Sequence, residues 1–470
     1  MMTRKYLTIA FSWLIAPFCL AQEDEKKVLG PEKFMEIVQN HHPVARQADI
    51  QVAKGDAALR SSRGGFDPKL YGDYSQKYYD EKTYYGLFDG GLKIPTWFGM
   101  ELKTGIEKNE GVYLNPENNV PDAGLWYAGV SIPVGQGLFI DKRRAELRQA
   151  EIYSKSSRLD RQLIRNQLLY DAGKSYWDWF MAYHNLQVYE NALQLAQERF
   201  QAVKQSALLG DNPAIDTLEA GIQVQNRRLG LQSAQLDYAN TSALLSIYLW
   251  SDGIIPLEIS EETTPIPLDS VTSLQLEATY FSQLDSMINN HPELQQYRYK
   301  IDQLTLDKRL KREQIKPKLN LNYFALSEPI GENPMANLST NNYKWGLEFS
   351  MPILLRKERG ELKLANLKLE ETEMDIKNKL ATIEFKVQAS VNEWLTTLDQ
   401  IELYNQTVRD YLGLLNGERQ LFNAGESSLF LLNSRELGYI QAQLKLIELV
   451  SKNNKSILTT RYNLGELAVE

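Results

Sequence analysis

Two stretches of this sequence follow the same plan: His42–Pro68, HPVARQADIQVAKGDAALRSSRGGFDP, and His291–Pro317, HPELQQYRYKIDQLTLDKRLKREQIKP. Each opens with His-Pro, continues with charged, helix-favouring residues and ends in a proline. Further along, Ser131-Ile132-Pro133 is matched by Ser350-Met351-Pro352, and both lead into Arg/Lys-rich sequence. Such repetition indicates that one supersecondary unit occurs twice in the chain.

The repetition sets the expected domain organisation. Glu198-Arg199-Phe200 before Gly210 is matched by Glu418-Arg419-Gln420-Leu421-Phe422 before Gly425, again in the same order. We therefore expect a first repeat over 22–250, an extended equatorial connector over 251–285 that contains three prolines, and a second repeat over 286–470.

Residues 1–21 are expected to be a secretory signal peptide. A charged start (Arg4, Lys5) precedes a short apolar run, and small residues precede Gln22. Cys19, the only cysteine, lies inside this segment, where we expect ordinary cleavage rather than lipidation. Without residues 1–21 the net charge falls from −8 to −10, because two positive charges are removed. This acidity argues against nucleic acid as a partner.

Helical periodicity, with apolar residues three and four positions apart, predicts six long helical segments. These are 32–66, 141–209, 212–250, 286–316, 355–424 and 427–463. Each of the two longest has about the length of two shorter helices placed end to end. We therefore expect 212–250 and 286–316 to stack to match 141–209, and 32–66 and 427–463 to stack to match 355–424.

Strands are predicted before each long helix, where the apolar period changes to two. Trp126, Ala128, Val130 and Ile132 alternate with smaller or polar residues, and alternating apolar runs recur around Leu319–Ala325 and Tyr343–Phe349. From His42 to Pro133 there are 91 residues, but from His291 to Pro352 there are 61, so the first repeat has 30 additional residues. We expect these, around Phe88–Asn119, to form a longer loop or an extended hairpin.

Four such strands per chain cannot close a membrane barrel, because the smallest barrels have about eight. Open strand edges are not tolerated in lipid. Several chains must therefore share one barrel, and three chains with four strands each give twelve.

The duplicated order of helix, strand pair, long helix, glycine turn and returning helix resembles the TolC-type outer-membrane efflux channels. The Ser-x-Pro junctions at Pro133 and Pro352 match the strand-to-helix entry of that family. The resemblance implies a mainly α-helical protein with a membrane β-barrel, assembled as a homotrimer with twelve strands and a helical tunnel across the periplasm. It implies the outer membrane of a Gram-negative bacterium as the location. The implied partners are outer-membrane lipid, a periplasmic adaptor (membrane fusion) protein and an inner-membrane RND or ABC pump.

The resemblance also suggests which residues form the periplasmic tip and its gate. Gly210 and Gly425 suit the helix reversals, because glycine adopts positive φ without strain. Asp216 and Glu219 lie on one helical face and would give rings of three carboxylates in a trimer. They would equally serve as acidic residues at a helix N-terminus, and both interpretations stay open. In the second copy, Leu431 takes the position of Asp216, so the gate would be partly apolar, with Phe430 or Leu431.

Six aromatic strand residues are expected at the membrane interface. They are Tyr71, Tyr74, Trp126, Tyr323, Tyr343 and Trp345. The alternative is that they form the core of a soluble β-domain. Likewise, Tyr176, Trp177 and Trp179 either pack between helices or line the tunnel.

No catalytic, metal-binding or cofactor motif is recognisable, and the paired His-Pro sequences read as helix starts, so we expect no enzyme. The function expected is a channel that passively exports small molecules or polypeptides received from an inner-membrane pump. The alternative is a soluble periplasmic coiled-coil scaffold or adaptor.

Overall fold

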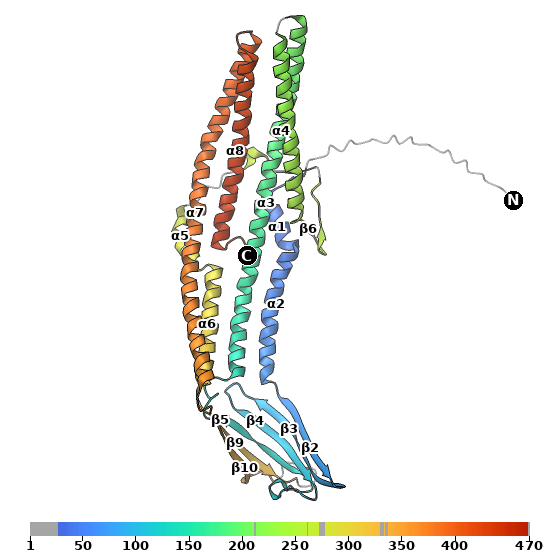
Figure 1. Cartoon of the computed structure of the whole chain (residues 1–470), viewed down its shortest axis with the longest axis vertical. Helices are drawn as coiled ribbons and strands as arrows, with labels where there is room; N and C mark the ends of the chain where they lie inside the picture. Colours follow the sequence, from blue (N-terminus) through green and yellow to red (C-terminus); the bar gives the residue numbers. More distant parts are fainter. Residues whose placement is uncertain are drawn as a thin grey trace, which may run out of the picture.

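The computed structural model describes residues 27–210, 213–260, 262–271, 278–329, 333 and 337–468. Figure 1 shows a long bundle of helices that continues at one end into a β-sheet. The opposite end carries two helical turns, at Gly210 and Gly425, which we call the tips. The expected signal peptide, 1–21, lies outside the described residues. In the part of the chain that is described, no helix is both long and apolar enough to cross a membrane.

Two helices of 68 residues each dominate the bundle. The helices of the described residues are α1 (Pro31–His41), α2 (Pro43–Arg63), α3 (Lys142–Leu209), α4 (Ala214–Ser246), α5 (Ala278–Asn289), α6 (Pro292–Glu313), α7 (Arg356–Asn423) and α8 (Leu429–Leu464). The predicted long segments are confirmed as helices, with three corrections. The segment 286–316 is interrupted at Asn290 and His291, between α5 and α6. The segment 32–66 is interrupted at His42, because the residue before a proline is disfavoured in helical conformation. The connector 251–285 is helical from Ala278 rather than extended throughout.

The two His-Pro sequences begin helices in the same way. In each, the histidine is the N-cap and the proline occupies the first helical turn. His42 Nδ1 accepts a hydrogen bond from the amide of Val44 at 3.2 Å, and His291 Nδ1 accepts one from the amide of Glu293 at 3.2 Å. The ring must be unprotonated at Nδ1 to accept, and burial lowers the pKa of both histidines below 6.5.

We expect acidification to lower the melting temperature of the His42→Asn/His291→Asn double variant less than that of the unsubstituted protein. Because the pKa values of both folded-state rings are lowered, the caps contribute fully above pH 6.5 and are lost as pH falls through the lower folded-state values. Asparagine caps a helix without titrating. Thermal unfolding by circular dichroism at about pH 7.5 and about pH 5 measures this difference.

The control for this prediction is His41→Asn, which removes a neighbouring imidazole that lies 3.1 Å from Asp252. It leaves both caps in place and should keep the full sensitivity to acid. His184 is partly buried, its pKa is also lowered, and it remains in every variant, so some acid sensitivity persists. Equal losses of melting temperature in the double variant and the unsubstituted protein would contradict a role for the caps.

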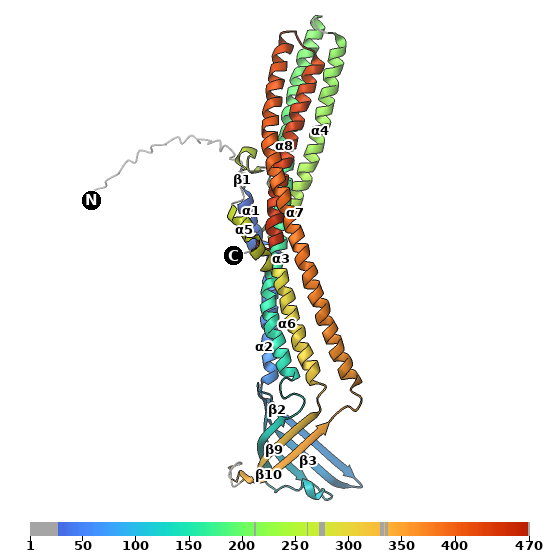
Figure 2. The same ribbon diagram turned by 90° about the vertical axis from the view of Figure 1, so that its left-hand side faces the viewer.

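Each long helix is flanked by short helices of its own repeat (Figures 1 and 2). α2 packs on the half of α3 near the sheet, and α4 on the half near the tips. α6 and α8 take the corresponding halves of α7. Both expected stackings are therefore wrong: α2, not α6, shares α3 with α4, and α6, not α2, shares α7 with α8. α8 also contacts α3, which joins the two repeats.

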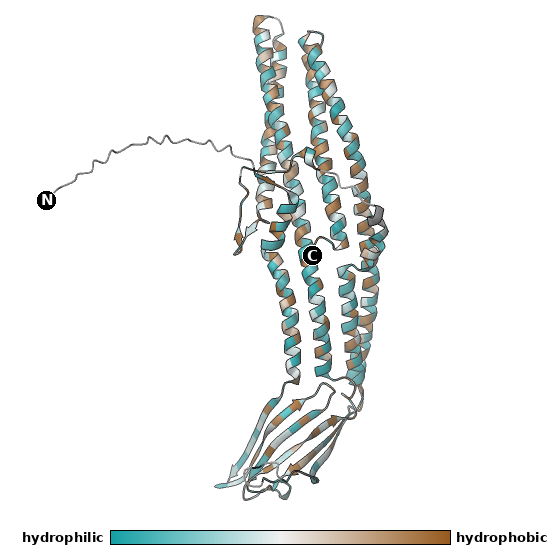
Figure 3. Cartoon of the chain, turned by 180° about the vertical axis from the view of Figure 1, so that it is seen from behind, coloured by the Kyte–Doolittle hydropathy of each residue, from teal (hydrophilic) through white to brown (hydrophobic). Residues whose placement is uncertain are grey.

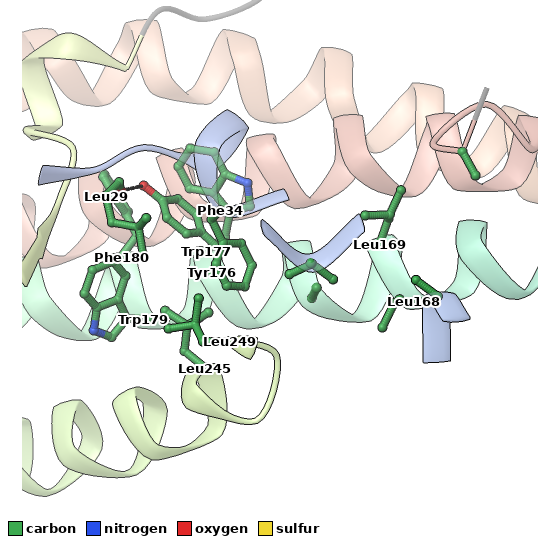
Figure 4. Close-up of a cluster of buried hydrophobic side chains, with 14 of the residues drawn as sticks. Leu29, Phe34, Leu168, Leu169, Tyr176, Trp177, Trp179, Phe180, Leu245 and Leu249 are labelled. Atoms are coloured by element: carbon green, nitrogen blue, oxygen red, sulfur yellow. Dashed lines mark hydrogen bonds between the residues drawn. The ribbon is translucent and has the colours of Figure 1, made fainter. Parts of the chain in front are cut away.

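The largest buried cluster surrounds the middle of α3, where α1 and the end of α4 approach it (Figure 4). Trp179 and Phe180 are fully buried, and Tyr176 is 1% exposed. The Tyr176 hydroxyl donates to the carbonyl of Leu29 at 2.8 Å, and Trp179 Nε1 donates to Ser242 Oγ at 3.1 Å. Tyr176, Trp177 and Trp179 thus pack between helices, which settles the alternative left open by the sequence.

The sheet has six strands in the described residues, not the predicted four. They are β2 (Lys69–Tyr79), β3 (Lys82–Pro95), β4 (Glu101–Glu110), β5 (Leu125–Pro133), β9 (Lys318–Ser327) and β10 (Ser339–Ser350). Their order is β10-β9-β5-β4-β3-β2, and every neighbouring pair is antiparallel. The additional residues of the first repeat form β3 and β4, which lie between β2 and β5. The prediction of four strands per chain, from which the twelve-stranded barrel of three chains was counted, is therefore wrong.

Two short strand pairs lie in and beside the connector. β1 (Lys27–Leu29) pairs in parallel with β8 (Thr263–Pro265), and β6 (Trp250–Ser251) pairs with β7 (Ile255–Pro256).

Candidate functional site

The sheet has one apolar face, which follows from its register. Successive side chains of a strand point to opposite faces, and paired residues share a face. Ile106 of β4 pairs with Trp126 of β5, and Val130 pairs with Tyr323 of β9. The same face carries Leu70, Tyr74, Phe88, Leu92, Leu102, Tyr343, Trp345, Leu347 and Phe349. Leu70 is 86% exposed and Phe349 66%, and an exposed apolar face of this extent marks a surface that another apolar medium covers.

Five of the six aromatic residues singled out in the sequence lie on this face. They are Tyr74, Trp126, Tyr323, Tyr343 and Trp345. Tyr71 lies on the opposite face, where its hydroxyl contacts the hydroxyl of Tyr127. Its assignment to the same aromatic group is wrong, because positions 71 and 74 differ by three and a period of two places them on opposite faces.

The opposite face is polar and concave. The Tyr127 hydroxyl donates to Asp89 Oδ1 at 2.6 Å, and Lys344 Nζ lies 3.0 Å from Glu107 Oε1. Lys344 and Glu107 are three strands and four residues apart in the register, which is roughly 20 Å in a flat sheet. Their extended side chains do not span that distance, so the contact shows that the sheet curls toward its polar face. The apolar face is consequently the convex one.

Two junctions lead from the sheet into the long helices. Pro133 ends β5, and Pro352 follows β10 by two residues. Asp141 caps α3 by accepting from the amide of Arg144 at 2.9 Å. Arg144 also donates to the carbonyls of Gly137 and Leu138. Sequence reasoning missed the role of Arg144, because its partners lie in a loop with no periodic pattern.

At the tips, Gly210 has a φ of +87° and Gly425 a φ of +78°. Each reverses the chain between a long helix and its returning helix. Nothing lies within 4 Å of a Cβ built on either glycine, so the requirement at these positions is conformational. Exposed apolar residues gather at these ends. They are Leu208 (73%), Leu209 (79%), Ile215 (70%), Leu218 (69%) and Phe430 (68%).

The structure separates the predicted gate residues. Asp216 is in the first turn of α4, half-buried, while Phe430 and Leu431 are exposed at the start of α8. Glu219 instead accepts a hydrogen bond from Asn433 Nδ2 of α8 at 3.0 Å. Glu219 therefore connects the α3–α4 hairpin to the α7–α8 hairpin of the same chain.

A buried group of charges, which we call the tip link, makes the same connection more strongly. Arg199 of α3 forms an ion pair with Glu436 of α8 and donates to Asn433 Oδ1 at 3.1 Å. Glu436 is 3% exposed, and Arg227 of α4 is 8% exposed. Burial lowers the pKa of Arg227, and the charge of Glu436 opposes that shift. The tip link comprises Arg199, Glu219, Arg227, Asn433 and Glu436.

Sequence reasoning recorded Arg199 only as part of a repeated Glu-Arg motif. Its partners lie more than 200 residues away in the sequence, so no local pattern identifies them.

Two helices carry exposed apolar stripes. The α4 seam consists of Ile215, Leu218, Ile222, Leu229, Leu236 and Leu244, and the α7 seam of Leu364, Leu367, Met374, Phe385, Leu403, Leu414 and Leu421. Spacings of three, four, seven, eight, eleven and eighteen keep each set on one side of its helix. Leu229 is 65% exposed and Phe385 73%. Both seams are thus suited to packing against another helix.

The comparisons with known proteins agree with this geometry. The chain is similar in fold to the outer membrane channel CmeC of Campylobacter jejuni, with 16% identity and a TM-score of 0.65 over 93% of this chain and 85% of that chain. It is similar to the open state of the MtrE outer membrane channel of Neisseria gonorrhoeae, with 12% identity and a TM-score of 0.68 over 93% of this chain and 89% of that chain. It is also similar to the outer membrane protein VceC of Vibrio cholerae, with 13% identity and a TM-score of 0.63 over 93% of this chain and 96% of that chain.

No curated protein matches the sequence. A family model, however, matches residues 103–249 and 284–452, which is more than half of the chain, and its description is outer membrane efflux protein. This chain therefore belongs to the outer membrane efflux protein family.

Proposed function

We propose that this chain forms the outer-membrane channel of a tripartite efflux or type I secretion system, with its sheet in the outer membrane and its helices in the periplasm. The observation that carries the proposal is the curled sheet with a convex apolar face and a concave polar face. Such a sheet is a wall segment of a transmembrane barrel whose lumen is polar. Because open strand edges are not tolerated in lipid, further copies of the chain must complete the wall.

The assembly that we propose is a homotrimer. The α4 seam and the α7 seam are exposed along most of their length in the single chain. Packing the α4 seam of one copy onto the α7 seam of the next buries both stripes and repeats around a closed ring. The helices of three copies then enclose the tunnel.

The tips face the inner membrane in this arrangement. The exposed leucines beside Gly210 and Phe430 beside Gly425 offer an apolar docking surface for a periplasmic adaptor protein. The adaptor connects the channel to an inner-membrane RND or ABC pump. That pump supplies the energy and selects the cargo, small molecules or polypeptides, while the channel itself is passive.

The tip link controls opening in this proposal. Arg199 and Glu436 hold the two hairpins of a chain together beside the turns, so separating them widens the tunnel at its narrow end. Asp216 and Phe430, repeated in three copies, line the constriction between the turns.

Differential extraction tests the proposed location. The protein should sediment with outer membranes, stay in the pellet after high-salt and alkaline washes, and be released by mild detergent. Salt releases proteins that are held by charge alone, whereas an apolar convex sheet in lipid requires detergent. Release by salt would contradict the channel and support the soluble coiled-coil scaffold instead.

A further inference from the structure

The sheet ends in two strands that each lack a neighbour on one side. β2 and β10 are the outermost strands and have 11 and 12 residues. Strands of about 9–11 residues are long enough to cross a membrane. All neighbours in the six-stranded sheet are antiparallel, so its first and last strands run in opposite directions. The β10 edge of one copy can therefore pair with the β2 edge of another and continue the antiparallel pattern.

The β3–β4 hairpin is built into the middle of this sheet. β3 pairs with β2 and β4 pairs with β5, both over most of their length. Gly105 of β4 makes room for the ring of Tyr127, since a Cβ at this position would lie 2.7 Å from the Tyr127 hydroxyl oxygen. That hydroxyl in turn donates to Asp89 of β3. The hairpin is therefore fitted to its neighbours and is not an appendage on the rim.

The two faces of the hairpin match the two faces of the rest of the sheet, apolar on the convex side and polar on the concave side. On the convex face it presents Leu92 and Ile94 of β3 and Leu102 and Ile106 of β4. On the concave face it presents charged residues. They are Asp89, Lys93, Glu101, Lys103 and Glu107. An apolar outside and a charged inside are what a lipid-facing barrel wall requires.

We propose that the β2 edge of each copy pairs with the β10 edge of the next, so that three copies of this six-stranded sheet close a barrel of eighteen strands. The proposal rests on the proposed outer-membrane trimer and specifies its membrane wall. Barrel diameter grows roughly linearly with strand number, so this wall is about 1.5 times as wide as a twelve-stranded one. Barrels of about 16–18 strands enclose an aqueous channel, so the outer exit accommodates bulkier cargo than a twelve-stranded exit does.

Cysteine pairs across the two edges test the pairing. Asp73 is the fifth residue of β2, Gly346 is the fifth residue from the end of β10, and both lie on the concave face. The Asp73→Cys/Gly346→Cys variant, treated with an oxidant or a short bismaleimide in outer membranes, should run on denaturing gels as covalent dimers and trimers. The natural Cys19 lies in the expected signal peptide, before the described residues, and contributes no background once that peptide is removed.

The control variant moves one cysteine a single strand inward. Asn322 of β9 pairs with Gly346 in the register, and β10 separates it from the edge. Asp73→Cys/Asn322→Cys should therefore remain monomeric on the same gels. Crosslinking of the control as strongly as the edge variant would contradict the pairing.

Electron cryomicroscopy of the detergent-extracted protein then separates this inference from the proposed function. A trimer with eighteen strands in its wall supports both. A trimer whose wall has twelve strands, with β3 and β4 outside it, overturns the eighteen-stranded barrel and leaves the channel intact. A particle without a shared barrel overturns the proposed function itself.

Discussion

Leu229→Lys/Leu236→Lys will prevent trimer assembly and leave the protein as separate chains. Both leucines lie at the centre of the α4 seam and are 65% and 61% exposed in the single chain. In the proposed trimer they are buried against the α7 seam of the next copy. Two lysines placed there must give up their hydration without a partner, at a cost of several kcal/mol each. Because both positions are exposed within the chain, the fold of the single chain should be preserved.

Native mass in mild detergent measures this effect, and circular dichroism confirms that helix content is unchanged. Gln235→Lys is the matched control, because this residue is exposed on the same helix but points about a third of a turn away from the seam. It should assemble like the unsubstituted protein. If the double lysine variant assembles equally well, the seams are not the contact between copies.

Glu436→Ala will open the tunnel and raise the single-channel conductance in planar bilayers. Glu436 is 3% exposed and forms an ion pair with Arg199, while Arg227 lies in the same buried group. Removing one partner of a buried pair costs about 3–5 kcal/mol, because it leaves charge uncompensated. If that cost falls on the closed arrangement of the hairpins, the equilibrium shifts toward the open state by at least about 100-fold.

The comparison variant is Glu448→Ala on the same helix. Glu448 lies 2.8 Å from Lys445, but both side chains are about half exposed, at 51% and 42%. A surface pair of this kind contributes about 1 kcal/mol or less, so the conductance should stay at that of the unsubstituted protein. Equal conductance of the Glu436→Ala and Glu448→Ala channels would show that the tip link does not hold the channel closed.

The helical part of the fold could be predicted from the sequence to within a few residues. α3 was expected over 141–209 and spans Lys142–Leu209, and α7 was expected over 355–424 and spans Arg356–Asn423. Long apolar periodicity, bounded by Asp141 as N-cap and by glycine after the last turn, makes such helices recognisable. The pairing of short helices was wrong, because segment lengths contain no information on which neighbour a helix packs against.

The strand count was underestimated for a physical reason. β5, β9 and β10 alternate aromatic or aliphatic residues with polar ones, and this alternation is easily recognised. The alternation of β3 is instead interrupted by Gly86 and Gly90-Gly91, and β4 carries Gly105 and several charged residues with only Leu102 and Ile106 as large apolar ones, which resembles a loop. Glycine fits there because Tyr127 of the neighbouring strand lies over Gly105, a contact between residues 22 positions apart.

The candidate site was predictable only where it depends on local conformation. Gly210 and Gly425 stand where the backbone needs positive φ, which a repeated glycine between two helices already indicates. The tip link joins Arg199 to Asn433 and Glu436, and only the packing of α8 against α3 brings these residues together. For Glu219 a tunnel ring and a role at the helix N-terminus were both open, and the same packing brings its carboxylate to Asn433 instead.

The most direct test of the channel is the native mass of the unsubstituted protein after extraction from outer membranes in mild detergent. We expect a particle of three chains, because the curled six-stranded sheet cannot close a barrel alone and its edges cannot remain open in lipid. A single chain, obtained without detergent and stable in aqueous buffer, would show that the protein is not an outer-membrane channel.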